Sequence, residues 1–177
     1  MTKLYLNTNN TCKLIRKSGS FKNKTFAEMS QLILDNLRLG TSFEVINKNK
    51  QPLPHRGSYY LLYLEEFNMA TLLYLDVSKD IRILYYGDME NAVYSLYRGL
   101  ATGTTVKFLK SEARKTYRVV DDAGEEVSFE FKNRDAEICN QKYLKIFDAI
   151  NYAVKLHKET GKTYSVVTKS GTTLITV

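Results

Sequence analysis

Apolar positions recur in the same arrangement around three glycines, each of which follows a helical pattern and precedes a strand pattern. The glycines are Gly40, Gly103 and Gly161, separated by 63 and 58 residues, and a third of the 177-residue chain is 59. Apolar side chains stand fourteen, eleven and seven residues before each glycine, a spacing that indicates one buried helix face. Another apolar pair stands three and five residues after each, the alternation of a half-buried strand. The pattern predicts one helix–strand unit repeated over about residues 1–65, 66–122 and 123–177.

The rest of the pattern predicts the order of the elements. Helices are expected at about 25–39, 88–101 and 141–159, and strands at about 3–6, 12–16, 43–47, 58–65, 70–77, 81–86, 104–110, 116–121, 126–131, 163–168 and 172–177. Thr25 and Glu28 fit a capping box at the first helix, and Gly40 is expected to be its left-handed C-terminal cap. Hairpin-length turns favour mostly antiparallel sheet. We therefore expect an α+β fold with three helices, in a single domain of residues 1–177.

Composition narrows the class of protein. With 44% hydrophobic and 25% charged residues, the chain is typical of globular proteins. Its longest apolar run, Tyr59–Leu64, is far shorter than the roughly 20 residues of a membrane helix, and no signal-peptide pattern opens the sequence. Cys12 and Cys139 fit neither a metal pattern nor a disulfide framework and are expected to be buried free thiols. These features favour a cytoplasmic protein with no membrane partner and no cofactor.

Charge is the feature that most suggests a partner. The net charge is +7, but residues 1–56 carry +7 and 105–118 carry +4, whereas 57–104 carry −3 and 119–137 carry −5. Such blocks can build a basic face for a polyanion, although solvated charge on exposed elements explains them equally well. Two basic runs are candidates for phosphate contacts: Lys13, Arg16, Lys17, Lys22 and Lys24, and then Lys107, Lys110, Arg114, Lys115 and Arg118.

Aromatic residues strengthen that interpretation. The chain has thirteen tyrosines and no tryptophan, and several tyrosines fall on predicted strands. Sheets that present aromatic rings in a basic groove bind single-stranded nucleic acid, although tyrosine is also an ordinary strand residue. Our leading hypothesis is a small protein without catalytic activity that binds nucleic acid or a nucleoprotein.

One loop supports a second hypothesis. Residues 48–57 include both prolines of the chain, which makes this segment semi-rigid. Its polar residues would project toward a partner: Lys48, Lys50, His55 and Arg56. Small size, few catalytic signatures and a Lys-, Asn- and Tyr-rich composition are typical of phage and mobile-element accessory proteins. The second hypothesis is therefore an inhibitor that docks on a host enzyme, for example a defence enzyme.

A third hypothesis comes from Glu130 and Lys132, which form a Glu-x-Lys motif downstream of Asp121 and Asp122. Over residues 88–168 the motif and the order of elements resemble the core of the PD-(D/E)xK nucleases, which implies a divalent metal held by the acidic residues. A turn centred on residues 123–124 would place Asp121 opposite Glu126 and Glu130 opposite Tyr117. The two carboxylates would then lie about 13 Å apart, too far to share one ion. The sequence therefore predicts neither a metal site nor a catalytic residue.

Overall fold

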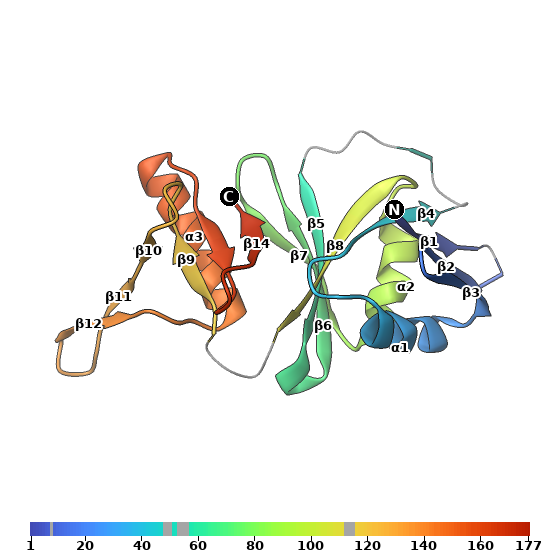
Figure 1. Cartoon of the computed structure of the whole chain (residues 1–177), viewed down its shortest axis with the longest axis horizontal. Helices are drawn as coiled ribbons and strands as arrows, with labels where there is room; N and C mark the ends of the chain where they lie inside the picture. The colour runs from blue at the N-terminus through green and yellow to red at the C-terminus, as the bar shows by residue number, and fades with distance from the viewer. Residues whose placement is uncertain (8, 48–50, 53–56, 112–115) are drawn as a thin grey trace. The chain divides into compact units, whose positions relative to one another are not determined.

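The computed structural model describes residues 1–177 except 8, 48–50, 53–56 and 112–115. The chain divides into two compact units, an N-terminal unit of Met1–Ser111 and a C-terminal unit of Glu112–Val177. The described residues form three α-helices and mostly antiparallel sheets, so the predicted α+β class is confirmed (Figure 1). Within these residues, no helix is both long enough and apolar enough to span a membrane.

The N-terminal unit is built on one sheet of eight described strands in the order β3-β2-β1-β4-β8-β5-β6-β7. Its elements, in chain order, are β1 (Thr2–Leu6), β2 (Cys12–Arg16), β3 (Gly19–Lys24), α1 (Phe26–Asn36), β4 (Ser42–Asn47), β5 (Ser58–Leu64), the 3₁₀ turn η1 (Glu65–Phe67), β6 (Met69–Leu75), β7 (Ile81–Gly87), α2 (Met89–Gly99) and β8 (Thr104–Ser111). The strand β3 was not expected from the sequence.

The sheet consists of two halves with the same topology. In the first half β1 pairs antiparallel with β2 and parallel with β4, and in the second half β5 pairs antiparallel with β6 and parallel with β8. The halves join where β4 and β8 pair antiparallel. Across this junction the Gly40 N–H donates to the Phe108 carbonyl at 2.7 Å, and the Gly103 N–H donates to the Val45 carbonyl at 2.7 Å. Since Val45 and Phe108 are also 63 residues apart, the junction has an approximate twofold symmetry.

The helix ends agree only in part with the expectation. The capping box of Thr25 and Glu28 is present, with both hydrogen bonds at 3.1 Å. However, α1 ends at Asn36, and its C-cap residue Leu37 has an extended backbone. Gly40, with φ 84°, lies beyond the helix in the turn that leads into β4. The prediction that Gly40 caps the helix was therefore wrong, because its positive φ serves the turn and the junction between the halves.

Both helices pack on one face of the sheet, as alternate strand positions show. The core joins residues of α1 and α2 to the strand positions that point toward them, among them Leu4, Leu14, Phe43, Leu61 and Phe108, all fully buried. In Figure 1 the two helices lie side by side. Each such apolar side chain stabilises the fold by about 1.5–3 kcal/mol. The strand positions between them point to the opposite face.

The C-terminal unit contains two smaller sheets and one helix. One sheet has the strand order β10-β9-β13-β14, and the other is the hairpin of β11 and β12. The elements are β9 (Arg118–Val120), β10 (Glu126–Val127), β11 (Phe129–Lys132), β12 (Ile138–Gln141), α3 (Ile146–Thr160), β13 (Ser165–Val167) and β14 (Thr173–Thr176). Gly161, with φ 73°, is the C-cap of α3.

Two features of the C-terminal unit differ from the expectation. The strand expected at 126–131 is interrupted at Ser128, and its second part pairs with β12, which was not predicted. The strand after α3 pairs antiparallel with β9 and β14, whereas the strands after α1 and α2 each pair with a parallel partner. The twofold topology of the N-terminal unit thus does not extend to the third glycine, and a threefold sequence repeat stays a prediction.

Candidate nucleic-acid interface

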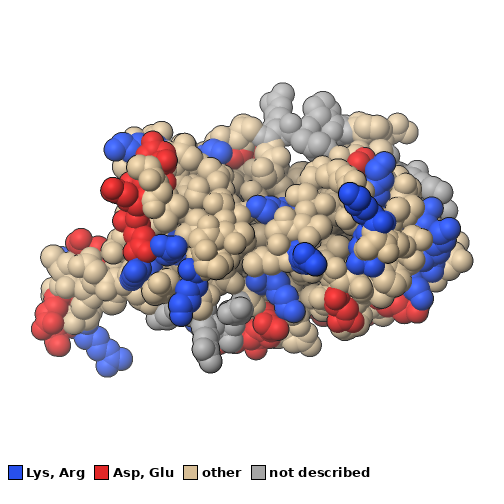
Figure 2. Space-filling view, viewed as in Figure 1, with Lys and Arg blue, Asp and Glu red and all other residues tan. Residues whose placement is uncertain are grey.

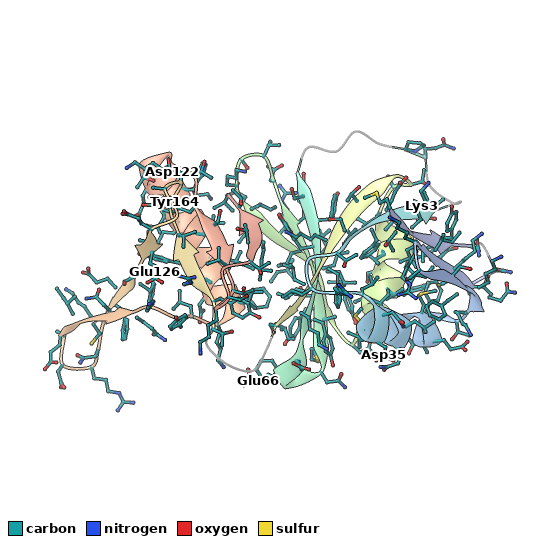
Figure 3. All side chains as sticks on the ribbon, viewed as in Figure 1. Lys3, Asp35, Glu66, Asp122, Glu126 and Tyr164 are labelled. Atoms are coloured by element: carbon teal, nitrogen blue, oxygen red, sulfur yellow. The ribbon has the colours of Figure 1, made fainter. Side chains whose placement is uncertain are left out.

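The face of the N-terminal sheet opposite α1 and α2 carries lysines in its first half. We call the surface formed by Lys3, Tyr5, Lys13, Ile15, Glu44, Ile46 and Lys107 the open face; the side chains of all seven are half-buried. Lys3 and Tyr5 come from β1, and their neighbours Leu4 and Leu6 point to the core. Figure 3 labels Lys3 among these strands, and Figure 2 shows Lys and Arg side chains gathered over the region of β1–β3.

Two cross-strand relations organise the open face. Tyr5 and Lys13 are paired in the β1–β2 register, and the Lys13 Nζ atom lies 4.4 Å from the centroid of the Tyr5 ring. Lys107, on β8, lies opposite Ser42 of β4, and partial burial lowers the pKa of its ammonium group. Glu44 lies opposite Lys3 in the β1–β4 register and is the acidic residue among the described strand positions of this face. The face is therefore basic, with one half-buried aromatic ring.

The second half of the sheet differs at the equivalent positions. By the strand register, Lys3, Tyr5 and Ile15 correspond to Tyr60, Leu62 and Leu73, and Ile46 corresponds to Leu109. Lys3 and Lys13 therefore lie in the first half of the sheet, and Lys107 lies across the junction on β8, at the position that corresponds to Glu44.

The first predicted basic run does not form a single surface. Lys13 lies on the open face, whereas Arg16 points to the helix-facing side, where its guanidinium lies 5.1 Å from the centroid of the Phe21 ring. Lys17 is exposed in the turn after β2, and Lys22 and Lys24 lie on the edge strand β3. Alternation along β2 separates its neighbouring cations, so Lys13 joins the open face and Arg16 does not.

The second predicted run is divided between the two units. Lys107 points to the open face and Lys110 to the other side of β8, where its Nζ atom lies 3.7 Å from the Glu65 carboxylate. Arg118, on β9, pairs with the Glu126 carboxylate, whose other oxygen lies 3.3 Å from the Lys142 ammonium. The hydrogen bond from Arg118 holds the pKa of Glu126 below its ordinary value. Figure 3 labels Glu126 beside these strands.

Several predicted residues lie outside the described part of the chain. These are Lys48, Lys50, His55 and Arg56 of the proline-containing loop, together with Arg114 and Lys115 of the second run. The hypothesis of a protein-docking loop therefore has no described contact to support it.

The Glu-x-Lys segment does not have the arrangement expected from the sequence. Glu130 pairs with Asn140 of β12, and Tyr117 pairs with Leu144, so the predicted pairing of Glu130 with Tyr117 was wrong. Glu126 pairs with Val120 in place of Asp121. The Asp121 carboxylate accepts the N–H groups of Ala123 and Glu125 at 3.0 and 2.9 Å and thereby closes the turn. Among the described residues, no three His, Cys, Asp or Glu side chains are placed to hold a metal ion.

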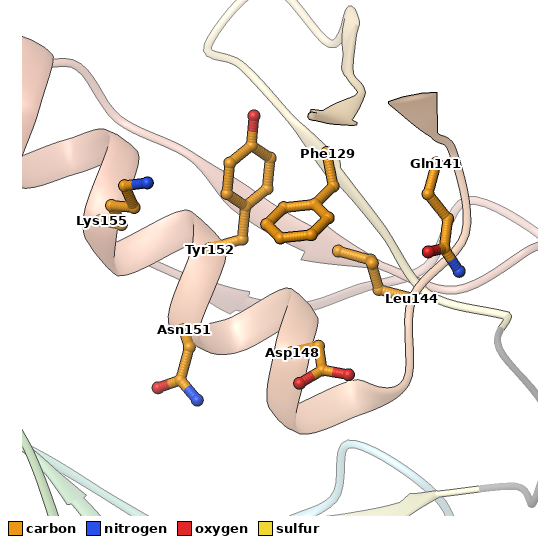
Figure 4. A pocket seen from close by; sticks show the side chains of 7 residues that line it. All are labelled: Phe129, Gln141, Leu144, Asp148, Asn151, Tyr152 and Lys155. Carbon is orange, nitrogen blue, oxygen red and sulfur yellow. The ribbon is translucent and has the colours of Figure 1, made fainter. Parts of the chain in front are cut away.

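A pocket of about 320 Å³ in the C-terminal unit lies beside β11, the strand that contains Glu130 and Lys132 (Figure 4). Leu144 and Phe129 form its apolar part, and the Phe129 ring meets Tyr152 edge-on with 5.1 Å between centroids. The Tyr152 hydroxyl donates to the Ser128 carbonyl at 2.9 Å, and burial raises the pKa of this phenol. Asp148 and Lys155 stand at its rim. These contacts hold β11 against α3 and account for the aromatic pair structurally.

Sequence reasoning identified Lys13 and Lys107 but missed Lys3 and Tyr5. Both missed residues lie in a short strand without a charge cluster, and the only signal was the alternation of Lys3 and Tyr5 with Leu4 and Leu6. Comparison with known proteins found no matching family model, no matching curated protein and no matching solved structure.

Proposed function

We propose that this protein binds nucleic acid, without catalysis, through the open face of its N-terminal unit. The observation that supports the proposal is that Lys3 and Lys13 lie next to Tyr5 on one side of a sheet whose other side is closed by helices, with Lys107 on the same side two strands away. Lysines in such a surface contact phosphates and contribute affinity without sequence specificity.

Single-stranded nucleic acid fits this surface better than a duplex. The half-buried Tyr5 ring offers a platform on which an unpaired base can stack, and one such contact contributes about 1–3 kcal/mol. The Lys13 ammonium near the ring adds a charge for the adjoining phosphate. A duplex keeps its bases stacked within the helix and offers no base plane to Tyr5.

The proposal predicts the salt dependence of binding. Three phosphate contacts to a single strand predict that affinity falls about 20-fold between about 50 and 200 mM salt. Fluorescence anisotropy with single-stranded DNA and RNA of about 16 nucleotides, and with the matching duplexes, measures it. The double variant Lys3→Gln/Lys13→Gln leaves one contact, and its salt-dependent loss should shrink to about threefold.

A matched control separates this surface from net charge. Lys79→Gln removes one positive charge from the turn after β6, at the other end of the sheet order, and should leave the salt dependence unchanged. Absence of binding by the natural protein at about 50 mM salt would overturn the proposal. A Lys79→Gln effect as large as that of Lys13→Gln would show that binding follows net charge and not this face.

A further inference from the structure

A second basic site lies on the helix-facing side of the sheet, where β2 and α1 end and β1 and β4 begin. A pocket of about 470 Å³ opens there, lined by Arg16, Lys17 and Arg38 together with Thr2, Asn36 and Thr41. Its volume falls within the range of about 300–1,000 Å³ that is typical of small-molecule sites. The cations come from separate segments, since Arg16 ends β2, Lys17 follows it in the turn, and Arg38 follows α1. The fold, and not a local charge run, brings them together.

Among the described residues, the side chains of these three cations have no acidic partner. No carboxylate of that part of the chain lines the pocket, and the side chains of Arg16, Lys17 and Arg38 take part in neither a hydrogen bond nor an ion pair there. The Arg16 Nε atom is buried without a partner. The centroid of the Phe21 ring lies 5.1 Å from the guanidinium carbon of Arg16, and the ring restricts the orientations of this guanidinium group. A buried donor with no partner is costly, and a bound water, ion or ligand is one way to satisfy it.

The cations are also not required to stabilise the end of α1. A helix C-terminus carries about half a negative charge, which three positive charges exceed. Its last turn already has partners, since the Leu37 N–H donates to the Ile33 carbonyl at 3.0 Å and the Asn36 side chain donates to the Leu32 carbonyl at 2.9 Å. The net charge of the pocket therefore remains positive.

The second half of the sheet provides an internal comparison. By the strand register, Thr2 and Arg16 correspond to Tyr59 and Tyr74, whose rings lie 4.8 Å apart. Arg38 corresponds to Ala101, 63 residues later in the same turn. The end of α2 thus has the same backbone hydrogen bonds, Leu100 N–H to Leu96 and Thr104 N–H to Ala101, with no cation at either equivalent position. The scaffold itself does not need Arg16 or Arg38.

We propose that this pocket binds a phosphate monoester group. A monoester carries a charge of about −1.5 to −2 at neutral pH, which three cations can neutralise. Arginine forks bind phosphate oxygens in pairs, and the ring beneath Arg16 limits the orientations of its fork. The site is on the other side of the sheet from Lys3 and Lys13 and does not depend on the proposed function of the open face.

The test is isothermal titration calorimetry of the full chain in a phosphate-free buffer. The probes are inorganic phosphate, adenosine 5′-monophosphate, and an oligonucleotide with either a 5′-phosphate or a 5′-hydroxyl. We expect heat from the phosphorylated probes. Tighter binding of the nucleotide would indicate a free phosphorylated metabolite, and tighter binding of the 5′-phosphorylated strand would indicate a strand end.

Arg38→Ala is the primary variant because Arg38 is exposed and alanine occupies the equivalent position in the second half. It should weaken phosphate binding about tenfold or more, since a hydrogen bond to a charged group contributes about 1.5–3 kcal/mol. Arg16→Gln should do the same, and Lys79→Gln should have no effect. Unchanged melting temperatures would show that the variants remain folded. Equal affinity of Arg38→Ala and the natural protein, or no heat with any phosphate, would overturn the proposal.

Discussion

At the scale of single residues, the two cysteines show how burial decides chemistry. Cys12 is fully buried in the core of the N-terminal unit, and burial raises the pKa of its thiol to about 12. Cys139 is half-buried on β12, so the expectation that both thiols are buried was wrong for this one. Alternation along a short, polar strand did not reveal on which side Cys139 lies.

We therefore predict that only one thiol of the folded protein reacts quickly with a disulfide reagent at about pH 8. The thiolate is the reactive form, and Cys12 remains protonated at that pH. Absorbance of the released reagent thiol should show one rapid equivalent per chain and a second only after denaturation. Cys139→Ser should remove the rapid equivalent. Two rapid equivalents in the natural protein would contradict the burial of Cys12.

At the scale of elements, the sequence predicted the three helices and most of the strands, because their apolar periodicity reflects one buried face. It missed β3, whose sequence Gly19–Lys24 contains Phe21 as its single apolar residue. It also missed β12, which is held by pairing with β11 rather than by a buried face. Strands of this kind form because a neighbouring strand offers hydrogen-bond partners. The apolar periodicity of a segment does not show which strand will lie beside it.

The capping box of α1 gives a prediction at this scale. Thr25→Ala removes the hydroxyl that accepts the Glu28 N–H and should lower the free energy of unfolding by about 1 kcal/mol. Urea denaturation followed by circular dichroism measures the change. Thr25→Ser keeps the hydroxyl and should cost less than Thr25→Ala. Equal losses in the two variants would mean that the methyl group, and not the cap, stabilises the helix.

At the scale of the whole chain, the twofold arrangement of the N-terminal unit was the least predictable feature. The 63-residue spacing of Gly40 and Gly103 was visible, but the antiparallel pairing of β4 with β8 joins strands from different halves. The same limit applied to the candidate sites. Lys13 and Lys107 were identified by charge, whereas their place on the same side of the sheet as Lys3, and the meeting of Arg38 with Arg16, depend on pairings distant in sequence.

Gly40 and Gly103, the glycines at the junction of the two halves, should contribute to the stability of the fold to a similar degree. With φ 84° and 87°, Gly40→Ala and Gly103→Ala each force alanine into a left-handed backbone and should cost about 1–2 kcal/mol. A Cβ at Gly103 meets no atom within 4 Å and one at Gly40 meets only the Lys107 side chain at 3.8 Å, so backbone strain dominates. Chemical denaturation of each variant measures the loss.

Gly99→Ala is the matched control for this pair. Gly99 is the last residue of α2, its added Cβ meets open space, and its φ is not positive. The substitution should leave the free energy of unfolding unchanged or raise it slightly. Losses in all three variants would show that small size, rather than the left-handed conformation, is what these positions require.

The same strand order also sets how the protein behaves at high concentration. The sheet ends at β3 and β7, and each presents a row of backbone groups that another chain can pair with. β3 carries Lys22 and Lys24, whose charges oppose pairing with another chain, whereas β7 exposes Ile83, Leu84 and Tyr86. Crowded molecules that meet at β3 repel one another, while those that meet at β7 can adhere. Lysines introduced along β7 are therefore expected to raise the solubility of this chain.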